Sequence, residues 1–401
     1  MKYHRRNNYC DRMKVHSKNM NKVIILGNDH TNTLGLTQVL GRGGYYVIAC
    51  VWGEKRGLVE TSRYCKEIYG GLNPEACIGI ICSFSSENDS KKIPIIASCD
   101  DAALALERNR NILKDRFVFE YTTGPYTIEQ LLEKKLQVRL ATEAGFNVPR
   151  SWQLNALKKD NGEVKYPILI KPLVSAKGAK EDIRISKNKD ELEANLASLH
   201  CTKEVIAQQY IDHDFEISIL GCGLSNGDVM IPCVENKLSL YPLKVGLECL
   251  AKMQPLTDET IISPITKLVR QIGYVGLFSV EMMHNREDDK FYFTEINLRN
   301  DGANSFVYKY GVNLPLMHIE DLQGSKQQKS PTEVKPGYYI WDMHHFLSLI
   351  HRDISVLKWI QELRKSNGFL TYFQEDTKPF YRQYRNWLLQ KLQIRKKVQY
   401  K

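Results

Sequence analysis

Long apolar runs are missing from this sequence. No segment of the 401 residues reaches the roughly 18–20 apolar residues that a membrane-spanning helix needs. The N-terminal stretch MKYHRRNNYCDRMKVHSKNMNK is basic and has no apolar centre, which argues against a secretory signal. We expect residues 1–19 to be a disordered basic leader, or to precede a true start at Met20. With 43% hydrophobic and 25% charged residues, the chain has the composition of a cytoplasmic globular protein.

Paired cysteines and two common chemical motifs are also missing. The ten cysteines include no C-x-x-C pair, which argues against a zinc ribbon or a disulfide framework and favours reduced thiols. The loop GNDHTNTLG after the first strand lacks the G-x-G-x-x-G of a dinucleotide site. No Ser/His/Asp or Cys/His arrangement stands out, and we expect packing or surface roles for His284, His318, His344 and His345. No nucleic-acid-binding module is recognisable.

Acidic residues are absent from Lys378 to the C-terminus, although the whole chain carries a net charge of +10. Apolar side chains recur in this tail at helical spacing among the basic ones: Phe380, Tyr384, Trp387, Leu388 and Leu392. The pattern predicts an amphipathic helix with two interpretations left open. The helix either lies on an anionic membrane face or packs its apolar stripe on the protein.

The length predicts two or three domains. We expect an α/β domain over 20–120, with strands at 22–27, 45–52, 77–84 and 92–98 and a helix beginning at Asp100 or Asp101. A second domain of strands and helices covers 121–325. The polar segment QGSKQQKSPTEVKPG then leads to a mostly helical, aromatic and basic extension over 337–401.

The segment FYFTEINLRNDG, residues 291–302, begins as a buried strand and then becomes polar at alternate positions. Alternation along a strand predicts that Phe291, Phe293, Glu295, Asn297 and Arg299 share one face. An acid, an amide and a guanidinium in one row call for a chemical explanation. The plain alternative is an edge strand whose outer face turns polar as it leaves the core.

A second strand-like run, GYVGLFSVEMM, precedes this segment across a polar turn. If the two pair as a hairpin centred near Asp288, Glu281 lies opposite Glu295, and two like charges in that position destabilise a sheet. A divalent cation removes the conflict, because two carboxylates and an amide oxygen are hard ligands suited to Mg²⁺. Arg299 can then grip a phosphate. The sequence therefore predicts a magnesium–phosphate site.

Several motifs in order make residues 20–320 resemble an ATP-grasp enzyme. EKKLQVRLATEAGFNVP resembles the family's opening lysine–helix–Gly–Pro segment, and YPILIKPLVSAKGAK its lysine strand and small-residue loop. VIAQQYID with the following FE resembles the hinge strand, and FSVEMM and FTEINLRNDG resemble the metal strands. The resemblance implies an α/β (α+β) chain with a Rossmann-like pre-ATP-grasp domain, an ATP-grasp domain of two α+β subdomains and a helical C-terminal extension.

The resemblance also implies roles for single residues. Arg299 and Lys171 would act on the transferring phosphoryl group, and Glu281, Glu295 and Asn297 would hold Mg²⁺, with Mn²⁺ as an alternative ion. The implied ATP-binding residues are Lys135, Lys171, Ser175, Lys177, Gly178, Gln208, Gln209, Ile211 and Glu216. Gln208 departs from the Glu common at that hinge position, although an amide also bonds a base edge. Arg63, Lys237 and Lys244 are candidates for binding an acidic acceptor, with solvated surface roles as the alternative.

The implied reaction is ADP-forming ligation of a carboxylate to an amine through an acyl phosphate. The segments LGLTQVLGRGGYYVIAC, ETSRYCK and YKYGVNLPLMHIEDL are similar to the D-aspartate ligase-like branch, which suggests small amino acids or cell-envelope precursors as substrates. Two alternatives stay open: a carbamoyl-phosphate-type carboxylate kinase, and an inactive ATP-binding scaffold. A homodimer and peripheral membrane contact are further options.

Overall fold

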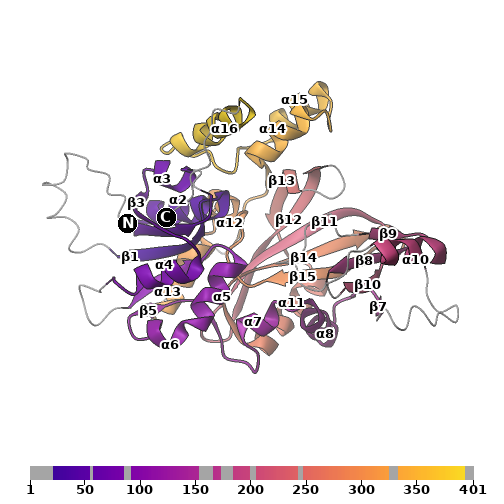
Figure 1. The fold of residues 1–401 in the computed structure, drawn as a ribbon, viewed down its shortest axis with the longest axis horizontal. Helices are drawn as coiled ribbons and strands as arrows, with labels where there is room; N and C mark the ends of the chain where they lie inside the picture. Colours follow the sequence, from indigo (N-terminus) through magenta and orange to yellow (C-terminus); the bar gives the residue numbers. More distant parts are fainter. Residues whose placement is uncertain are drawn as a thin grey trace, which may run out of the picture.

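A computed structural model of the protein describes residues 21–54, 57–84, 92–152, 166–172, 184–198, 205–242, 247–324 and 333–392. Three sheets form its framework, and the largest lies between the other two (Figure 1). No helix in these ranges is both long enough and apolar enough to cross a membrane.

The first sheet is parallel, with strand order β3-β2-β1-β4-β5. Its strands are β1 (Lys22–Asn28), β2 (Tyr46–Trp52), β3 (Cys65–Gly71), β4 (Ile93–Ala97) and β5 (Phe117–Val118). Its helices are α2 (Thr31–Arg42), α3 (Leu58–Thr61), α4 (Pro74–Ile81), α5 (Asp100–Arg108) and α6 (Arg110–Leu113). Helices on both faces bury the central strands, which explains their nearly continuous apolar sequences.

The strand expected at 77–84 is wrong, because α4 occupies most of that segment. The Asn73 side chain accepts a hydrogen bond from the Ala76 N–H, and Pro74 takes the first helical turn, so the segment starts as a capped helix. Cys77, Ile78 and Ile81 are buried at helical spacing. The third strand is instead β3, whose half-polar sequence gave no strand signal.

The second sheet is small and has the order β7-β10-β8-β9. Its elements are β7 (Ser151–Trp152), β8 (Ile168–Pro172), β9 (Arg184–Ser186), β10 (Val205–Gln209) and α10 (Lys189–Ser198). Ile168, Ile170 and Ala207 pack with Leu192 of α10 in its core. Lys171 pairs with Ile206 in the ladder between β8 and β10.

The third sheet has the order β15-β14-β11-β12-β13-β16, and β6 pairs with β14. Its strands are β6 (Tyr121–Thr122), β11 (His213–Gly223), β12 (Val229–Tyr241), β13 (Leu247–Pro255), β14 (Tyr274–Asn285), β15 (Lys290–Asn297) and β16 (Gly337–Ile340). The accompanying helices are α7 (Ile128–Leu131), α8 (Lys134–Ala144), α11 (Glu259–Ile272), α12 (Asn304–Lys309) and α13 (Leu314–Leu322). Adjacent strands of the main path run antiparallel, and the consecutive strands β11–β12–β13 and β14–β15 form hairpins.

The first and third sheets are joined through helices α2, α12 and α13. Helix α2 approaches α12 so closely that a Cβ added at Gly35 would lie 2.2 Å from Ser305 Oγ. Leu36 and Leu40 share a buried cluster with Phe306 of α12. The strand ends of the first sheet are therefore held beside the segment that follows β15.

The C-terminal extension contains α14 (Asp342–Ile350), α15 (Val356–Lys365) and α16 (Lys378–Lys391), which lie together along the upper edge in Figure 1. It begins with β16, which adds to the large sheet beside β13, and is otherwise mostly helical, as expected. Buried Asp376 ties it to the first sheet's helices, accepting hydrogen bonds from Gln38 Nε2 at 3.0 Å, Ser62 Oγ at 2.5 Å and the Arg63 N–H at 2.8 Å. The domain boundaries expected from the sequence stay predictions.

Candidate active site on the large antiparallel sheet

The β14–β15 hairpin has the register expected from the sequence. Glu281 pairs with Glu295, and Ser279 pairs with Asn297, so the two carboxylates lie directly opposite each other. The chain reverses at 286–289, where Asp289 adopts φ 56°. We call Glu281, Glu295 and Asn297 the acid row.

The expected face of β15 is partly wrong, because the pairing register shifts between Glu281 and Met282. Met282 pairs with Phe293, which leaves Thr294 as an extra residue. The bulge turns Phe291 and Phe293 to the apolar side with Ile296, while Glu295 and Asn297 keep the polar side. One strand can therefore supply both a packed aromatic face and an acidic one.

Lys237 of β12 lies at the centre of three carboxylates. Its Nζ is 2.5 Å from Glu281 Oε2, 2.9 Å from Glu248 Oε1 and 3.4 Å from Glu216 Oε2. The register explains the grouping, since Glu216 of β11 pairs with Lys237 on one side and with Met283 on the other. We call Lys237 with these three glutamates the lysine cluster.

Charges in the lysine cluster perturb its members strongly. Burial lowers the pKa of Lys237, but the surrounding carboxylates outweigh burial and hold this pKa well above its usual value. Burial raises the pKa of Glu281 to about 7, against the opposing effect of Lys237. Glu235, two residues before Lys237, is buried and accepts a hydrogen bond from the Tyr339 hydroxyl, and burial raises its pKa too. Sequence reasoning missed Glu248 and Glu235, which only the sheet register brings here.

Arg299 follows β15 and is held by acids from two parts of the chain. Its Nε lies 3.2 Å from Asp100 Oδ1 at the start of α5, and its Nη1 lies 3.5 Å from Asp301 Oδ2. Burial lowers the pKa of Arg299, but both aspartates raise it, and the net shift is upward. Ser279 Oγ donates to Asp301 at 3.0 Å and is 3.4 Å from Asn297 Nδ2, so the guanidinium is linked to the acid row.

The lysine beside the acid row is Lys134, whereas the sequence pointed to Lys135. Lys134 Nζ is 3.2 Å from Glu295 Oε2, and its side chain is 20% exposed. Lys135 is exposed one residue further along α8, about 100° around the helix. Helix α7 ends at Leu131, two residues that are not helical follow, and α8 begins at Lys134. The role predicted for Lys135 stays a prediction.

The predicted hinge residues lie on and just after β10. Gln208 is 5% exposed and its Nε2 donates to Ser151 Oγ at 3.3 Å, so this amide is already partly satisfied. Gln209 Oε1 accepts from the Arg150 N–H at 3.4 Å, and Ile211 is buried. The large sheet begins two residues later, so this segment connects the second and third sheets. Ser175, Lys177, Gly178 and Lys244 lie outside the described residues, and only the backbone of Lys171 is described.

The donor atoms of the acid row suit Mg²⁺. No group of three or more His, Cys, Asp or Glu side chains that could hold a metal occurs among the described residues. The acid row offers two carboxylates and one amide oxygen. A hard divalent cation with water and phosphate oxygens in its remaining positions matches that set. Lys237 pairs with Glu281 and Lys134 pairs with Glu295, so each carboxylate of the row lies beside a positive charge.

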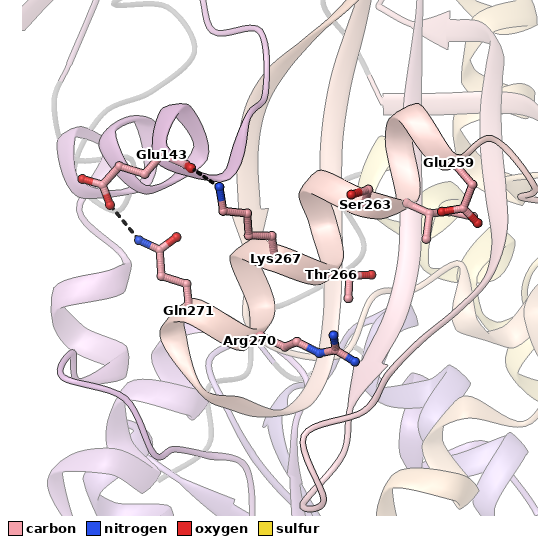
Figure 2. Close-up of a pocket in the computed structure, with 8 residues that line it drawn as sticks. Glu143, Glu259, Ser263, Thr266, Lys267, Arg270 and Gln271 are labelled. Atoms are coloured by element: carbon pink, nitrogen blue, oxygen red, sulfur yellow. Dashed lines mark hydrogen bonds between the residues drawn. The ribbon is translucent and has the colours of Figure 1, made fainter.

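A separate depression of about 670 Å³ lies on the outer side of α11 (Figure 2). Its lining residues are Glu143, Glu259, Ile262, Ser263, Thr266, Lys267, Arg270 and Gln271. Lys267 Nζ bonds to the Glu143 carbonyl and Gln271 Nε2 to Glu143 Oε2, both at 2.7 Å. None of the predicted site residues lines this depression, so the acid row is the better candidate site.

Comparison with known proteins finds a family match in the middle of the chain. The model of the ATP-grasp domain matches residues 139–306. The formate-dependent phosphoribosylglycinamide formyltransferase of Prochlorococcus marinus strain MIT 9312 is 24% identical over 232 residues, which cover 51% of this chain and 55% of that protein. The carbamoyl phosphate synthase large chain, C-terminal section, of Methanopyrus kandleri is 22% identical, over 52% of this chain and 40% of that protein. This chain thus spans just over half the length of the first of these relatives.

Solved structures show the same fold. N5-carboxyaminoimidazole synthetase from Staphylococcus aureus superposes with a TM-score of 0.65 at 14% identity, over 84% of this chain and 86% of that one. The structure of that enzyme complexed with ADP gives a TM-score of 0.63 at 16% identity, with the same coverage of both chains. None of these relatives is named a D-aspartate ligase, so the comparisons give the narrower branch no support.

Proposed function

We propose that this chain, whose residues 139–306 match the model of the ATP-grasp domain, is an ADP-forming ATP-dependent ligase that joins a carboxylate to an amine. A substrate carboxylate would attack the γ-phosphate of ATP and give an acyl phosphate and ADP. An amine would then displace phosphate and form an amide. Phosphoryl transfer of this kind depends on positioning and charge neutralisation rather than on a side-chain nucleophile.

One observation carries the proposal: the sheet places Glu281 and Glu295 face to face, with Asn297 beside them and Arg299 linked to them through Asp301 and Ser279. Two opposed carboxylates on adjacent strands are unfavourable unless cations neutralise them. Mg²⁺, when bound there, supplies charge neutralisation for the phosphates. Glu281, Glu295 and Asn297 would hold it, and Arg299 would stabilise charge on the transferring phosphoryl group.

The nucleotide would lie between the second and third sheets. Gln208, Gln209 and Ile211 would face adenine, and Glu216 would accept the ribose hydroxyls. Lys171 would neutralise phosphate, together with Lys135, which the family resemblance implies, or Lys134, which lies beside Glu295. For the closing loop we keep the predicted set of Ser175, Lys177 and Gly178. Arg63, Lys237 and Lys244 are the candidates for holding an acidic acceptor, but Lys237 is already engaged by three carboxylates.

The carboxylate is proposed to be small. The name of the first curated relative makes it formate-dependent, which supports a one-carbon or similarly compact acid. The resemblance to D-aspartate ligases instead supports an amino acid or a cell-envelope precursor as a substrate, and we keep these compounds as the alternative substrate class. We place the reaction in the cytoplasm, since the eight cysteines of the described residues are free thiols. A homodimer is proposed as the assembly.

The test is ATP turnover by the purified protein with Mg²⁺ and pools of carboxylates, with and without amines, reading ADP, AMP and phosphate. We expect ADP and phosphate only when both an acid and an amine are present, and loss of turnover in Glu295→Gln. The matched control is Glu287→Gln, which changes an exposed glutamate in the turn of the same hairpin and should retain activity. AMP as the product, or full activity in Glu295→Gln, would refute the proposal.

A second candidate is a carboxylate kinase of the carbamoyl-phosphate-forming type, favoured by the match to a section of a carbamoyl phosphate synthase. The same assay separates the two functions. Formation of ADP with a carboxylate alone, and an acyl phosphate that hydroxylamine traps without any amine substrate, would favour the kinase. Tight binding of MgATP without turnover over all pools would favour an inactive scaffold.

A further inference from the structure

The outward side of α16 carries an unusual exposed stripe. Tyr381, Leu388 and Leu392 are 63%, 50% and 56% exposed, and the exposed residues Lys378 and Arg385 lie before and after Tyr381 along the helix. The five residues follow one another at steps of three or four, which places them on one side of the helix. Large apolar and basic side chains therefore alternate along a surface about 20 Å long.

The opposite side of α16 is fixed to the protein, so the stripe cannot simply roll inward. Phe380 contacts Phe369 at a ring distance of 5.5 Å, and Tyr384 and Trp387 pack edge-on against Phe346 at 5.3 and 5.0 Å. Between these aromatics the buried positions are polar. Gln383 Nε2, for example, donates to Thr371 Oγ1 at 2.8 Å. Some aromatic side chains of the tail thus pack on the protein, whereas Leu388 and Leu392 are exposed, and membrane contact stays a prediction.

The charge of this edge is one-sided. Helix α16 carries four basic residues, Lys378, Arg382, Arg385 and Lys391, and no acid. The acids just upstream point to partners within the protein: Glu362 pairs with His345, Glu375 with Arg42, and Asp376 bonds near the first sheet. Positive charge at this edge is therefore not neutralised locally by those acids.

Neighbouring α15 adds apolar surface at the same edge. Val356 and Leu357 are 60% and 74% exposed at its start, next to exposed Lys358. Both helices lie along the upper edge of the molecule in Figure 1, on the outer side of the extension. The exposed apolar residues are thus scattered over two helices and interleaved with lysine and arginine, rather than gathered into one groove.

We propose that this edge, defined by the exposed stripe of α16 with the start of α15, docks the protein on an anionic phospholipid membrane surface. Interleaved basic and apolar side chains with an interfacial tyrosine match the two-part attraction of such a surface, in which lysine and arginine meet headgroups and leucines enter the acyl boundary. Each basic residue at the surface contributes about 1 kcal/mol, roughly a fivefold gain in binding. The docking is independent of the reaction proposed above.

The test is co-sedimentation of the full-length protein with vesicles of phosphatidylcholine alone or with 30 mol% phosphatidylglycerol, at low and at high salt. We expect binding only to the anionic vesicles, weakening as salt rises. The variant Lys378→Gln with Arg385→Gln should bind about 30-fold more weakly, and Leu388→Ser with Leu392→Ser at least about tenfold more weakly. Circular dichroism would confirm that each variant keeps its fold.

The matched control is Lys187→Gln with Lys189→Gln, which removes two exposed lysines near α10, far along the sequence from this edge. It should bind like the wild type. Equal weakening by this control would mean that net charge alone drives binding and would overturn the assignment to this edge. Unchanged binding of the leucine variant, or no binding to anionic vesicles, would overturn the membrane proposal and leave an acidic protein partner as the candidate occupant.

Discussion

Lys237 offers the sharpest single perturbation of the candidate site. Its side chain is 8% exposed and its Nζ lies within 3.4 Å of three carboxylates. Lys237→Met keeps the length of the side chain but leaves three clustered glutamates without their central cation. Breaking a buried ion pair in this way costs about 3–5 kcal/mol of folding free energy, mostly because the remaining charges are left uncompensated.

For a domain of this size the loss corresponds to a decrease in melting temperature on the order of 10 °C. The assay is thermal unfolding at pH 8 in the absence of divalent ions. Lys290→Met is the matched control, since Lys290 is exposed at the start of β15, and its change should stay within about 0.5 kcal/mol.

The assignment of a metal site leads to a second prediction for the Lys237→Met variant. If Glu281 belongs both to the lysine cluster and to the acid row, Mg²⁺ should restore part of the lost stability and should raise the melting temperature of Lys237→Met more than that of the wild type. If Lys237→Met had the same melting temperature as the wild type, the claim that Lys237 holds the carboxylates together would be refuted.

Three other expectations concern separate parts of the chain. Lys134→Met should reduce ATP turnover by about tenfold or more, because it removes the charge beside Glu295, while Lys135→Met should change turnover less than about twofold; steady-state kinetics would show the reverse if Lys135 has the role. Burial raises the pKa of Glu120 from 4.5 to about 7, so its contribution to stability is full below pH 4.5 and declines as pH rises through 7. Glu120→Gln should therefore be stabilised relative to the wild type by up to about 3 kcal/mol at pH 8 but not at pH 4.5, and equal melting profiles at both pH values would contradict this. Asp376→Ala loses three hydrogen bonds that tie the extension to the first sheet's helices, so limited proteolysis within the extension should quicken by about 30-fold, and an unchanged rate would argue against the tie.

The sequence predicted the central pairing of the site because a hairpin with a short polar turn has few possible registers. Centring the turn near Asp288 was enough to place Glu281 opposite Glu295. The same reasoning could not place the bulge at Thr294, since a strict period of two contains no signal for an extra residue. The aromatic residues of β15 were therefore assigned to the wrong face.

Other errors have equally physical causes. The apolar run at 77–84 fits a buried strand or a short helix, and only the Asn73 cap with Pro74 decides between them. Lys134, which contacts Glu295, was not singled out in the sequence, because one step along a helix turns a side chain by about 100° and the facing side cannot be known in advance. Glu248 joins the lysine cluster through the pairing of β12 with β13, whose register shifts twice between Lys237 and Leu240, and a strict period of two does not predict such shifts.

The most direct test of the account is whether the acid row makes nucleotide binding depend on Mg²⁺. Calorimetric titration with ATP, with and without Mg²⁺, should show at least about tenfold tighter binding with the ion in the wild type, equivalent to about 1.4 kcal/mol. In the double variant Glu281→Gln with Glu295→Gln, ATP should still bind but the effect of Mg²⁺ should disappear. An unchanged Mg²⁺ effect in that variant would contradict the assignment of these carboxylates as the metal ligands.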